Sequence, residues 1–199
     1  MSRVPAVVRD AVEGDAAGLA TLWADVLVRP GAEGVGLPSV TEAQRAIARF
    51  AEAKDIRVLV ADVDGEVVGG IFLRVSLLSP LHPDRALHMS HLQVDPRFLR
   101  HGVGRALLEA GVTWAEQLGV ETVLAGAPAA DRDTNRFLAR LGLAQVAVLR
   151  FGSVAALRGK LPHDPSLLAR GGVRMGRSVG QVVAARRSQR RARGQDTVL

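Results

Sequence analysis

Arg100, His101, Gly102 and Gly104 lie in one short stretch whose residue types and spacing suit an anion-binding turn. The glycines let a ligand approach the main chain closely, because they carry no Cβ. An apolar-periodic segment follows without a helix breaker until Gly119. A helix that begins here points its first N–H groups and the positive end of its dipole at the turn. The stretch therefore predicts a phosphate-binding turn; the alternative is an ordinary strand-to-helix connection.

The segment before this turn, residues 87–94, alternates apolar and polar side chains and predicts a strand. Asp95-Pro96 ends that strand, since proline cannot extend a ladder of hydrogen bonds. The turn is therefore expected between a central strand and a long helix, and a further strand over residues 121–125 would lie parallel to the first.

At these residues the chain resembles the GNAT N-acetyltransferase superfamily. Val94-Asp95-Pro96 and Gly102-Val103-Gly104 match its signature, while Leu99 stands where the superfamily has Arg or Gln, with Arg100 one place later. A second resemblance lies in residues 131–143, where Phe137 and Gly142 match and Asp131 and Leu138 replace the superfamily's Asn and Tyr. Both motifs belong to the part of the superfamily that holds acetyl-CoA.

The resemblance implies an α/β (α+β) fold with a mixed, mostly antiparallel sheet, a parallel pair of strands that splay apart, and flanking helices. It implies acetyl-CoA as co-substrate, with its pyrophosphate at the turn and its pantetheine arm along the exposed backbone of the first splayed strand. The residues expected to contact it are Leu92, Val94, Leu99, Arg100, His101, Gly102, Val103, Gly104 and Arg105.

Acetyl transfer to an amine requires that the amine lose a proton and that the leaving thiolate be stabilised or protonated. The usual acid of the superfamily is a tyrosine, and this chain has none. His91 is the preferred base, and Ser90 could hold a water or protonate the thiolate. His88 is the other candidate; it lies three residues from His91, so a regular strand places the two on opposite faces. A structural role for either histidine stays open, and no metal site is expected.

The remaining elements follow from hydrophobic periodicity, caps and turns. The expected strands are residues 4–8, 57–63, 66–75 and 144–151, and the expected helices run from Asp15, from Ser39 to residue 53, over 131–143 and over 153–161. Residues 29–38 and 76–84 are expected to be loops, the second with Leu77, Leu78 and Leu81 covering the sheet or, as the alternative, lining a substrate pocket.

Charge divides the chain unevenly. The last 50 residues carry 11 Lys or Arg and two Asp, a balance of +9, whereas the other 149 carry 15 basic and 18 acidic side chains, a balance of −3. We therefore expect an acetyltransferase-like domain over residues 1–152 and a basic C-terminal extension over 153–199, helical or partly disordered. Residues 174–193 could contact nucleic acid or another acidic partner.

No stretch of 18 apolar residues and no secretory signal is present, so we expect a cytoplasmic protein without a membrane span. The expected acceptor is a primary amine of a small molecule or a protein, and a homodimer is an open alternative. A second hypothesis is a catalytically weak or inactive acetyltransferase-like binding module that docks on nucleic acid or a ribonucleoprotein through its basic tail.

Overall fold

The computed structural model of the 199-residue chain describes residues 6–27 and 37–161. The chain divides after Gly152 into two units, Met1–Gly152 and Ser153–Leu199. Within the second unit the described part is helix α5 (Val154–Lys160), where the sequence predicts a short helix. The expected tail contacts over 174–193 and most of the loop 29–38 lie outside the described residues, so the predicted division into a domain and a basic extension stays a prediction.

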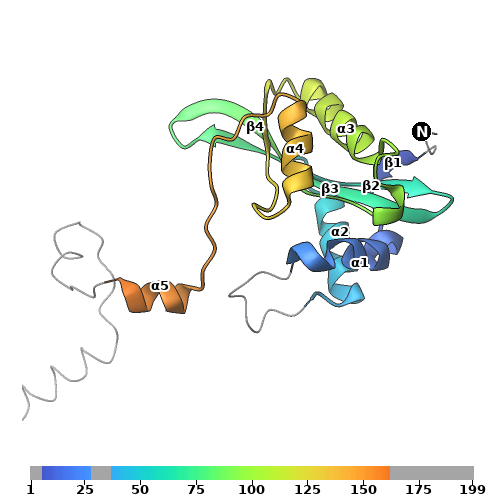
Figure 1. Cartoon of the computed structure of the whole chain (residues 1–199), viewed down its shortest axis with the longest axis horizontal. Helices are drawn as coiled ribbons and strands as arrows, with labels where there is room; N and C mark the ends of the chain where they lie inside the picture. Colours follow the sequence, from blue (N-terminus) through green and yellow to red (C-terminus); the bar gives the residue numbers. More distant parts are fainter. Residues whose placement is uncertain (1–5, 28–36, 162–199) are drawn as a thin grey trace, which may run out of the picture. The chain divides into compact units, whose positions relative to one another are not determined.

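Five strands form one sheet in the order β1-β2-β3-β4-β5. They are β1 (Val7–Asp10), β2 (Ile56–Val63), β3 (Glu66–Ser79), β4 (His82–Val94) and β5 (Thr122–Ala125). Strands β1 to β4 pair antiparallel with their neighbours, and β4 and β5 pair in parallel (Figure 1). The predicted mixed, mostly antiparallel sheet with one parallel pair is confirmed.

Helices cover both faces of the sheet (Figure 1). They are α1 (Ala16–Leu27) and α2 (Val40–Ala51) on one face, and α3 (Val103–Gln117) and α4 (Arg132–Arg140) on the other, with short 3-10 turns η1 (Glu13–Asp15) and η2 (Pro96–Phe98). Each face has its own apolar cluster: the first includes Leu19, Val58 and Val60, and the second includes Ile71 and Leu107.

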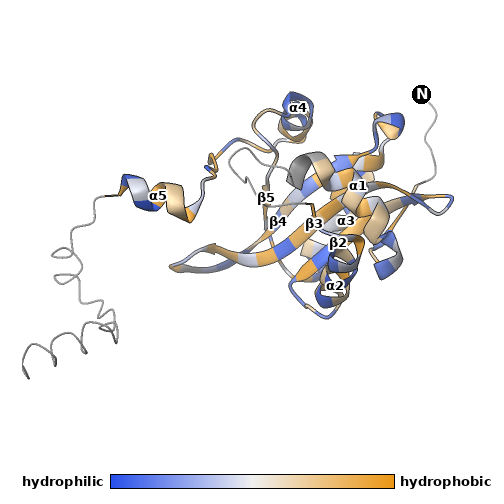
Figure 2. Cartoon of the chain, turned by 90° about the horizontal axis from the view of Figure 1, so that it is seen from below, coloured by the Kyte–Doolittle hydropathy of each residue, from blue (hydrophilic) through white to orange (hydrophobic). Residues whose placement is uncertain are grey.

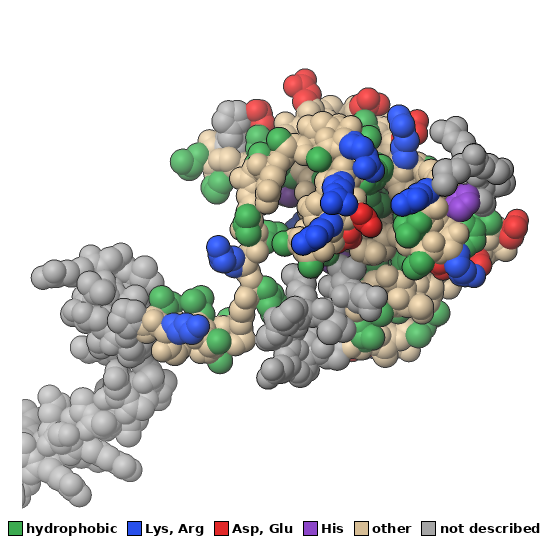
Figure 3. Space-filling view, viewed as in Figure 1, with side chains coloured by type: hydrophobic (Ala, Val, Ile, Leu, Met, Phe, Trp, Pro, Cys, Tyr) green, Lys and Arg blue, Asp and Glu red, His purple; other side chains and the backbone are tan. Residues whose placement is uncertain are grey.

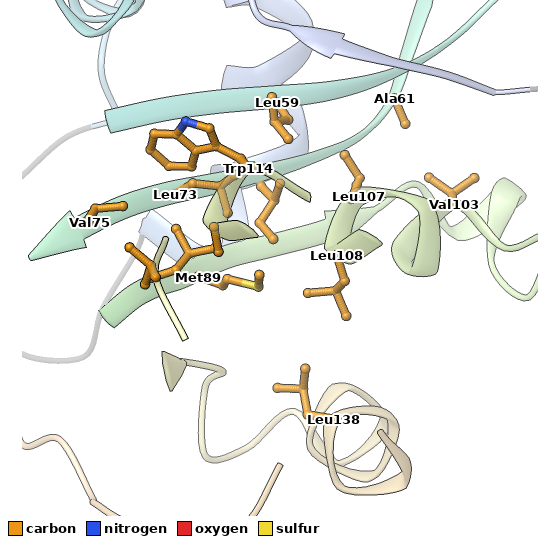
Figure 4. Close-up of a cluster of buried hydrophobic side chains, with 14 of the residues drawn as sticks. Leu59, Ala61, Leu73, Val75, Met89, Val103, Leu107, Leu108, Trp114 and Leu138 are labelled. Atoms are coloured by element: carbon orange, nitrogen blue, oxygen red, sulfur yellow. The ribbon is translucent and has the colours of Figure 1, made fainter. Parts of the chain in front are cut away.

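The larger cluster packs α3 tightly against the sheet (Figure 4). Leu73, Leu87 and Leu107 are fully buried there. Gly111 allows the close approach, because a Cβ at this position would lie 2.9 Å from Cε of Met89. This packing fixes the position of helix α3 relative to strand β4, and it therefore also fixes the two ends of the turn that connects them.

Arg9 ties the start of α1 to the sheet. Its guanidinium donates to the Asp15 carboxylate at 2.7 Å and 2.9 Å and to Asp62 at 2.8 Å. Asp15 also accepts from the N–H of Val12, so it closes the turn before the helix, where the sequence predicts an N-cap. These hydrogen bonds from Arg9 hold the pKa of the Asp15 carboxyl below its ordinary value.

Two local predictions are confirmed in detail. Asp64 and Gly65 both have positive φ, +51° and +84°, as a type I′ turn between β2 and β3 requires. Helix α2 begins with a capping box in which the Glu42 N–H donates to Ser39 Oγ and the Ser39 N–H donates to the Glu42 carboxylate.

The predicted loop 76–84 is wrong. Strands β3 and β4 continue through this region to a tight turn at Pro80 and Leu81, so they form a two-stranded ribbon beyond the other strands (Figure 2). Leu77, Leu78 and Leu81 are 55%, 41% and 97% exposed. The leucines therefore do not cover the sheet, and the preferred interpretation of them is wrong.

The predicted strand 144–151 is also wrong. Residues 144–151 form no strand and are exposed. The open edge strand on this side of the sheet is β5, which pairs with β4 on one side and, among the described residues, has no strand on the other.

Candidate functional site

A bulge in β4 shapes the centre of the site. Gly70 pairs with Gln93 and Phe72 with Ser90, so the single residue Ile71 lies opposite both His91 and Leu92. His91 takes a positive φ of +55°, which is uncommon for a residue other than glycine. The extra residue changes the direction of every side chain that follows it in the strand.

The bulge overturns the prediction that His88 and His91 lie on opposite faces. Leu87 and Met89 belong to the α3-side cluster, so His88 and Ser90 face α1 and α2. The ring of His91 lies on that same face, 5.8 Å from the Trp23 ring and 6.2 Å from the Phe72 ring, centroid to centroid. Both histidines therefore share a face with Ser90.

Trp23 of α1 holds the bulge in place. Its indole Nε1–H donates to the main-chain oxygen of His91 at 2.8 Å. Ser90 Oγ lies 2.9 Å from His91 Nδ1, so the hydroxyl and the imidazole form a hydrogen-bonded pair. Trp23 was not among the predicted site residues: it lies 68 positions from His91, and no local pattern connects the two.

Beyond the bulge, the main chain of β4 has no strand partner on the β5 side among the described residues. The last contact with the β5 side is the bond from the Gly126 N–H to the Met89 oxygen, at 2.8 Å. On the other side, Asp95 donates its N–H to Val68 of β3. Since main-chain groups alternate along a strand, those of Leu92 and Val94 point away from β3, to the side where β5 has ended.

The turn after β4 is fixed by its own side chains. Asp95 accepts from the N–H of Arg97 at 2.8 Å, and its carboxylate pairs with the Arg97 guanidinium at 2.7 Å. These hydrogen bonds hold the pKa of the Asp95 carboxyl below its ordinary value. Arg97 also pairs with Glu66. Arg97 is thus engaged within the protein, whereas Arg100 and Arg105 are exposed.

Four consecutive main-chain N–H groups at the start of α3 have no partner among the residues that the structure describes. Gly102 is the N-cap, with φ of +91° and no side chain to offer. The first helical bond runs from the Ala106 N–H to the Gly102 oxygen, at 3.0 Å. Within the described part of the chain, no protein group accepts from the N–H groups of residues 102–105. The first turn of α3 also holds no acidic residue.

Unpaired N–H groups and the positive end of a helix dipole together favour an anion. Figure 3 shows Lys and Arg side chains gathered on the face that carries α3 and α4, which adds to the positive potential there. A Cβ at Gly104 would lie 3.6 Å from Val94 Cγ2 and 3.8 Å from Phe137 Cε1. The start of α3 therefore lies beside the end of β4 and beside α4.

The residues predicted to contact acetyl-CoA differ in burial and in whether their side chain or their main chain could face a ligand. Val103 is buried in the core, so only its main chain can face a ligand. Leu99 is 53% exposed and Gly102 is exposed, and His101 is half-buried with an Nδ1 that has no partner among the described residues. Leu92 and Val94 pack their side chains against the core and offer main-chain groups instead.

A separate pocket of about 340 Å³ lies at the opposite edge of the sheet. It is lined by residues of α2, β1 and β2, among them Asp10, Phe50 and Arg57, and it contains none of the predicted site residues. Within residues 6–27 and 37–161, no cluster of three or more His, Asp or Glu side chains could hold a metal ion. Nor does any helix of this described part have the length and apolar character needed to cross a bilayer.

Comparison with known proteins decides the family. Residues 17–143 match the sequence profile of the acetyltransferase (GNAT) family. The chain belongs to this family. Among curated proteins, the comparison finds no match.

Solved structures share the GNAT fold over about three quarters of the chain. An aminoglycoside acetyltransferase from an uncultured soil metagenomic sample, in complex with sisomicin, is 21% identical with a TM-score of 0.58, over 75% of this chain and 95% of that one. Glucosamine-6-phosphate N-acetyltransferase from Arabidopsis thaliana is 15% identical with a TM-score of 0.61, over 75% and 98%. An aminoglycoside N-acetyltransferase in complex with CoA is 14% identical with a TM-score of 0.59, over 74% and 93%.

Proposed function

We propose that this GNAT domain transfers the acetyl group of acetyl-CoA to a primary amine. The observation that carries the proposal is the row of four N–H groups over residues 102–105 that have no partner among the described residues, beside the end of β4, where Leu92 and Val94 lie beyond the pairing with β5. The N–H groups suit a diphosphate. The main chain of Leu92 and Val94 suits a ligand whose amides can pair with a strand.

The residues present fit acetyl-CoA. The N–H groups of residues 102–105 would hold its diphosphate, and the exposed side chains of Arg100 and Arg105 could neutralise phosphate charge. The main-chain groups of Leu92 and Val94 would pair with the amides of its pantetheine arm. When bound, acetyl-CoA supplies the acetyl group as a thioester.

Ser90 and His91 are proposed to handle the protons. They lie on the α1 and α2 face, directly before the main chain of Leu92 and Val94, and share a hydrogen bond. The His91 imidazole would accept the proton of the attacking ammonium, and the Ser90 hydroxyl would hold a water or protonate the leaving thiolate. A thiol has a pKa of about 8.5, so the absence of tyrosine does not prevent departure of the thiolate at neutral pH.

Trp23 and Phe72 position the imidazole. Both rings pack against His91, and Trp23 in addition fixes the bulge through the His91 oxygen. These contacts restrict the motion of the imidazole, so a bound amine would meet it in a defined geometry.

The acceptor is proposed only as a class, a primary amine of a small molecule or of a protein. The structural relatives include enzymes named for aminoglycosides and for glucosamine 6-phosphate. The alternative function, a binding module that docks on nucleic acid, depends on residues 174–193, which lie outside the described chain, and no feature of the described part favours it.

Isothermal titration calorimetry with CoA and acetyl-CoA tests the proposal. We expect saturable binding to the wild-type chain and thiol release with at least one member of a panel of primary amines. Absence of binding at millimolar ligand would remove the proposal. Binding without thiol release on any amine would leave a CoA-binding protein and contradict the catalytic part.

A further inference from the structure

Arg74 of β3 lies on the same face of the sheet as the residues proposed to handle the protons. Its neighbours Leu73 and Val75 belong to the α3-side cluster, so the Arg74 side chain points to the α1 and α2 face. Arg74 follows Phe72, whose ring packs against His91, at the next position on that face. Alternate residues of a strand are about 7 Å apart, so the Arg74 side chain is within reach of a small molecule whose amine meets His91.

Arg74 differs from the other arginines of the described strands, because each of those has a partner within the protein. The partner is a carboxylate for Arg9 and Arg57, and it is the main-chain oxygen of Leu118 for Arg85. Arg74 is exposed and has no hydrogen bond or ion pair among the described residues. Its guanidinium is therefore available for the bidentate ion pair that arginine forms with anionic ligands.

The positions directly around Arg74 on this face carry no carboxylate. Ile56 of β2 and His88 of β4 lie opposite Arg74 in the strand register, and Phe72 and Ser76 flank it along β3. The Nε2 atom of His88 is buried, so the guanidinium is the group of this row that a ligand in solution can reach. Its positive charge attracts an anion and repels a second ammonium group.

From this placement we infer that the acceptor is a primary amine that also carries an anionic group, a carboxylate or a phosphate, and that Arg74 binds this group while His91 faces the amine. The inference rests on the proposed acetyl transfer and narrows its substrate class. An amine with a second cationic group does not fit, because the guanidinium repels it. The ion pair forms when the acceptor binds and persists during transfer, so it is expected to lower KM and to leave kcat unchanged.

Acetylation of three amines of similar length tests the inference: 6-aminohexanoate, hexylamine and 1,6-diaminohexane. We expect kcat/KM for 6-aminohexanoate to be at least about tenfold higher than for the other two, because it alone can form a charge-assisted pair with Arg74. A parallel measurement with 4-aminobutyl phosphate shows which of the two anions the site prefers. Similar kcat/KM values for the anionic, neutral and cationic amines would overturn the inference.

Substitution of Arg74 assigns the preference to this side chain. Arg74→Gln should raise KM for 6-aminohexanoate at least about tenfold and leave KM for hexylamine unchanged, whereas Arg74→Lys keeps the charge and should retain part of the preference. Arg85→Gln is the matched control, because it removes the same charge from the opposite face of the sheet. A preference for 6-aminohexanoate that survives Arg74→Gln would contradict the inference.

A measurement without turnover separates this inference from the proposed reaction. If no amine causes thiol release, the proposed reaction fails, and an NMR titration of the ¹⁵N-labelled chain then decides the role of Arg74. Its side-chain Nε–H signal, assigned by its absence from the spectrum of Arg74→Gln, should shift saturably with 6-aminohexanoate and much less with hexylamine. Equal responses to the two amines, or no response to either, would overturn the inference.

Discussion

Helices α2 and α3 begin in opposite ways. At α2, Ser39 and Glu42 satisfy N–H groups of the first turn through their own side chains. At α3, Gly102 provides no side chain, and the N–H groups of residues 102–105 have no partner in the described structure. A helix start that the protein caps itself contributes to stability, whereas one that is left open and lies beside the end of a strand can bind a ligand. We therefore propose a structural role for the start of α2 and a binding role for the start of α3.

Among the substitutions that test this comparison of the two helix starts, Gly104→Asp should have the largest effect, which is a loss of affinity for CoA. A carboxylate in the first turn of α3 would face the bound diphosphate, and two like charges about 4 Å apart repel by about 4 kcal/mol near a protein surface. Affinity for CoA should fall more than about a hundredfold. Calorimetry measures the loss, and thermal unfolding should show no destabilisation, because an acidic residue suits a helix N-terminus.

Gly104→Ala is the matched control for that variant. The added Cβ would make ordinary contacts of 3.6 Å with Val94 and 3.8 Å with Phe137. Affinity for CoA should therefore change only a few-fold. Equal losses in the alanine and aspartate variants would mean that space, and not charge, controls this position.

The base proposed at the bulge is tested by His91→Ala. Loss of a general base typically lowers kcat by 10²–10⁴-fold, while CoA affinity should be retained because the diphosphate site is separate. His88→Ala is the control, since His88 shares the face but is not hydrogen-bonded to Ser90. Similar kcat values for the His91 variant and the wild type would contradict the proposed role.

Converting the open helix start into a capped one should reduce binding by a smaller factor. In Arg105→Glu, a carboxylate at the third helical position can accept from the N–H of Gly102, as Glu42 does at α2. We expect about tenfold weaker CoA binding and a gain of about 0.5 kcal/mol in unfolding free energy. Arg105→Ala separates the loss of the arginine charge from occupation of the site, because alanine has no side-chain acceptor for the Gly102 N–H.

The reverse change at α2 should alter stability alone. Ser39→Ala removes the cap and should cost about 1 kcal/mol of unfolding free energy. Denaturant unfolding measures this loss. CoA affinity should stay at the wild-type value, and a clear drop in affinity would show that the two helix starts are coupled.

The smallest expected difference between the starts of α2 and α3 is in how their amide NMR signals respond to pH. Hydrogen bonds from Ser39 hold the pKa of Glu42 below its ordinary value of 4.5. The ionised Glu42 carboxylate therefore stabilises the folded state fully at pH values above 4.5. This stabilisation is lost as the pH falls through the lowered pKa that Glu42 has in the folded state. An NMR titration should show the Ser39 N–H signal shifting with Glu42 in acid, while the first turn of α3, which has no carboxylate, shows no such transition.

The parts of the fold that the sequence predicts correctly depend on local signals. The Asp64–Gly65 turn and the Ser39 capping box both act within a few residues. The open turn at Gly102 is of the same kind, because glycine and the absence of acidic residues are visible in the chain itself. Local residue types therefore predict the uncapped helix start, and its use as an anion site stays a prediction.

The wrong predictions concern positions whose structure depends on residues that are distant in the sequence. The bulge at His91 depends on pairing with β3 and on Trp23, so the two-residue period of a regular strand gave the wrong face for one histidine. Pro83 indicated a loop, but it lies in β4 next to an irregularity in pairing, a place where a strand tolerates proline. Residues 144–151 have the composition of a strand but form none, because pairing in a sheet depends on another segment and not on composition alone.

The central claim is that the N–H groups of residues 102–105 are left unpaired for a diphosphate. An NMR titration of the ¹⁵N-labelled chain with CoA tests it directly. The account predicts that the amide signals of Gly102, Val103, Gly104 and Arg105 shift most, while those of Ser39 and Glu42 stay in place. Saturable shifts that bypass the start of α3 and occur instead at the Asp10, Phe50 and Arg57 pocket would contradict it.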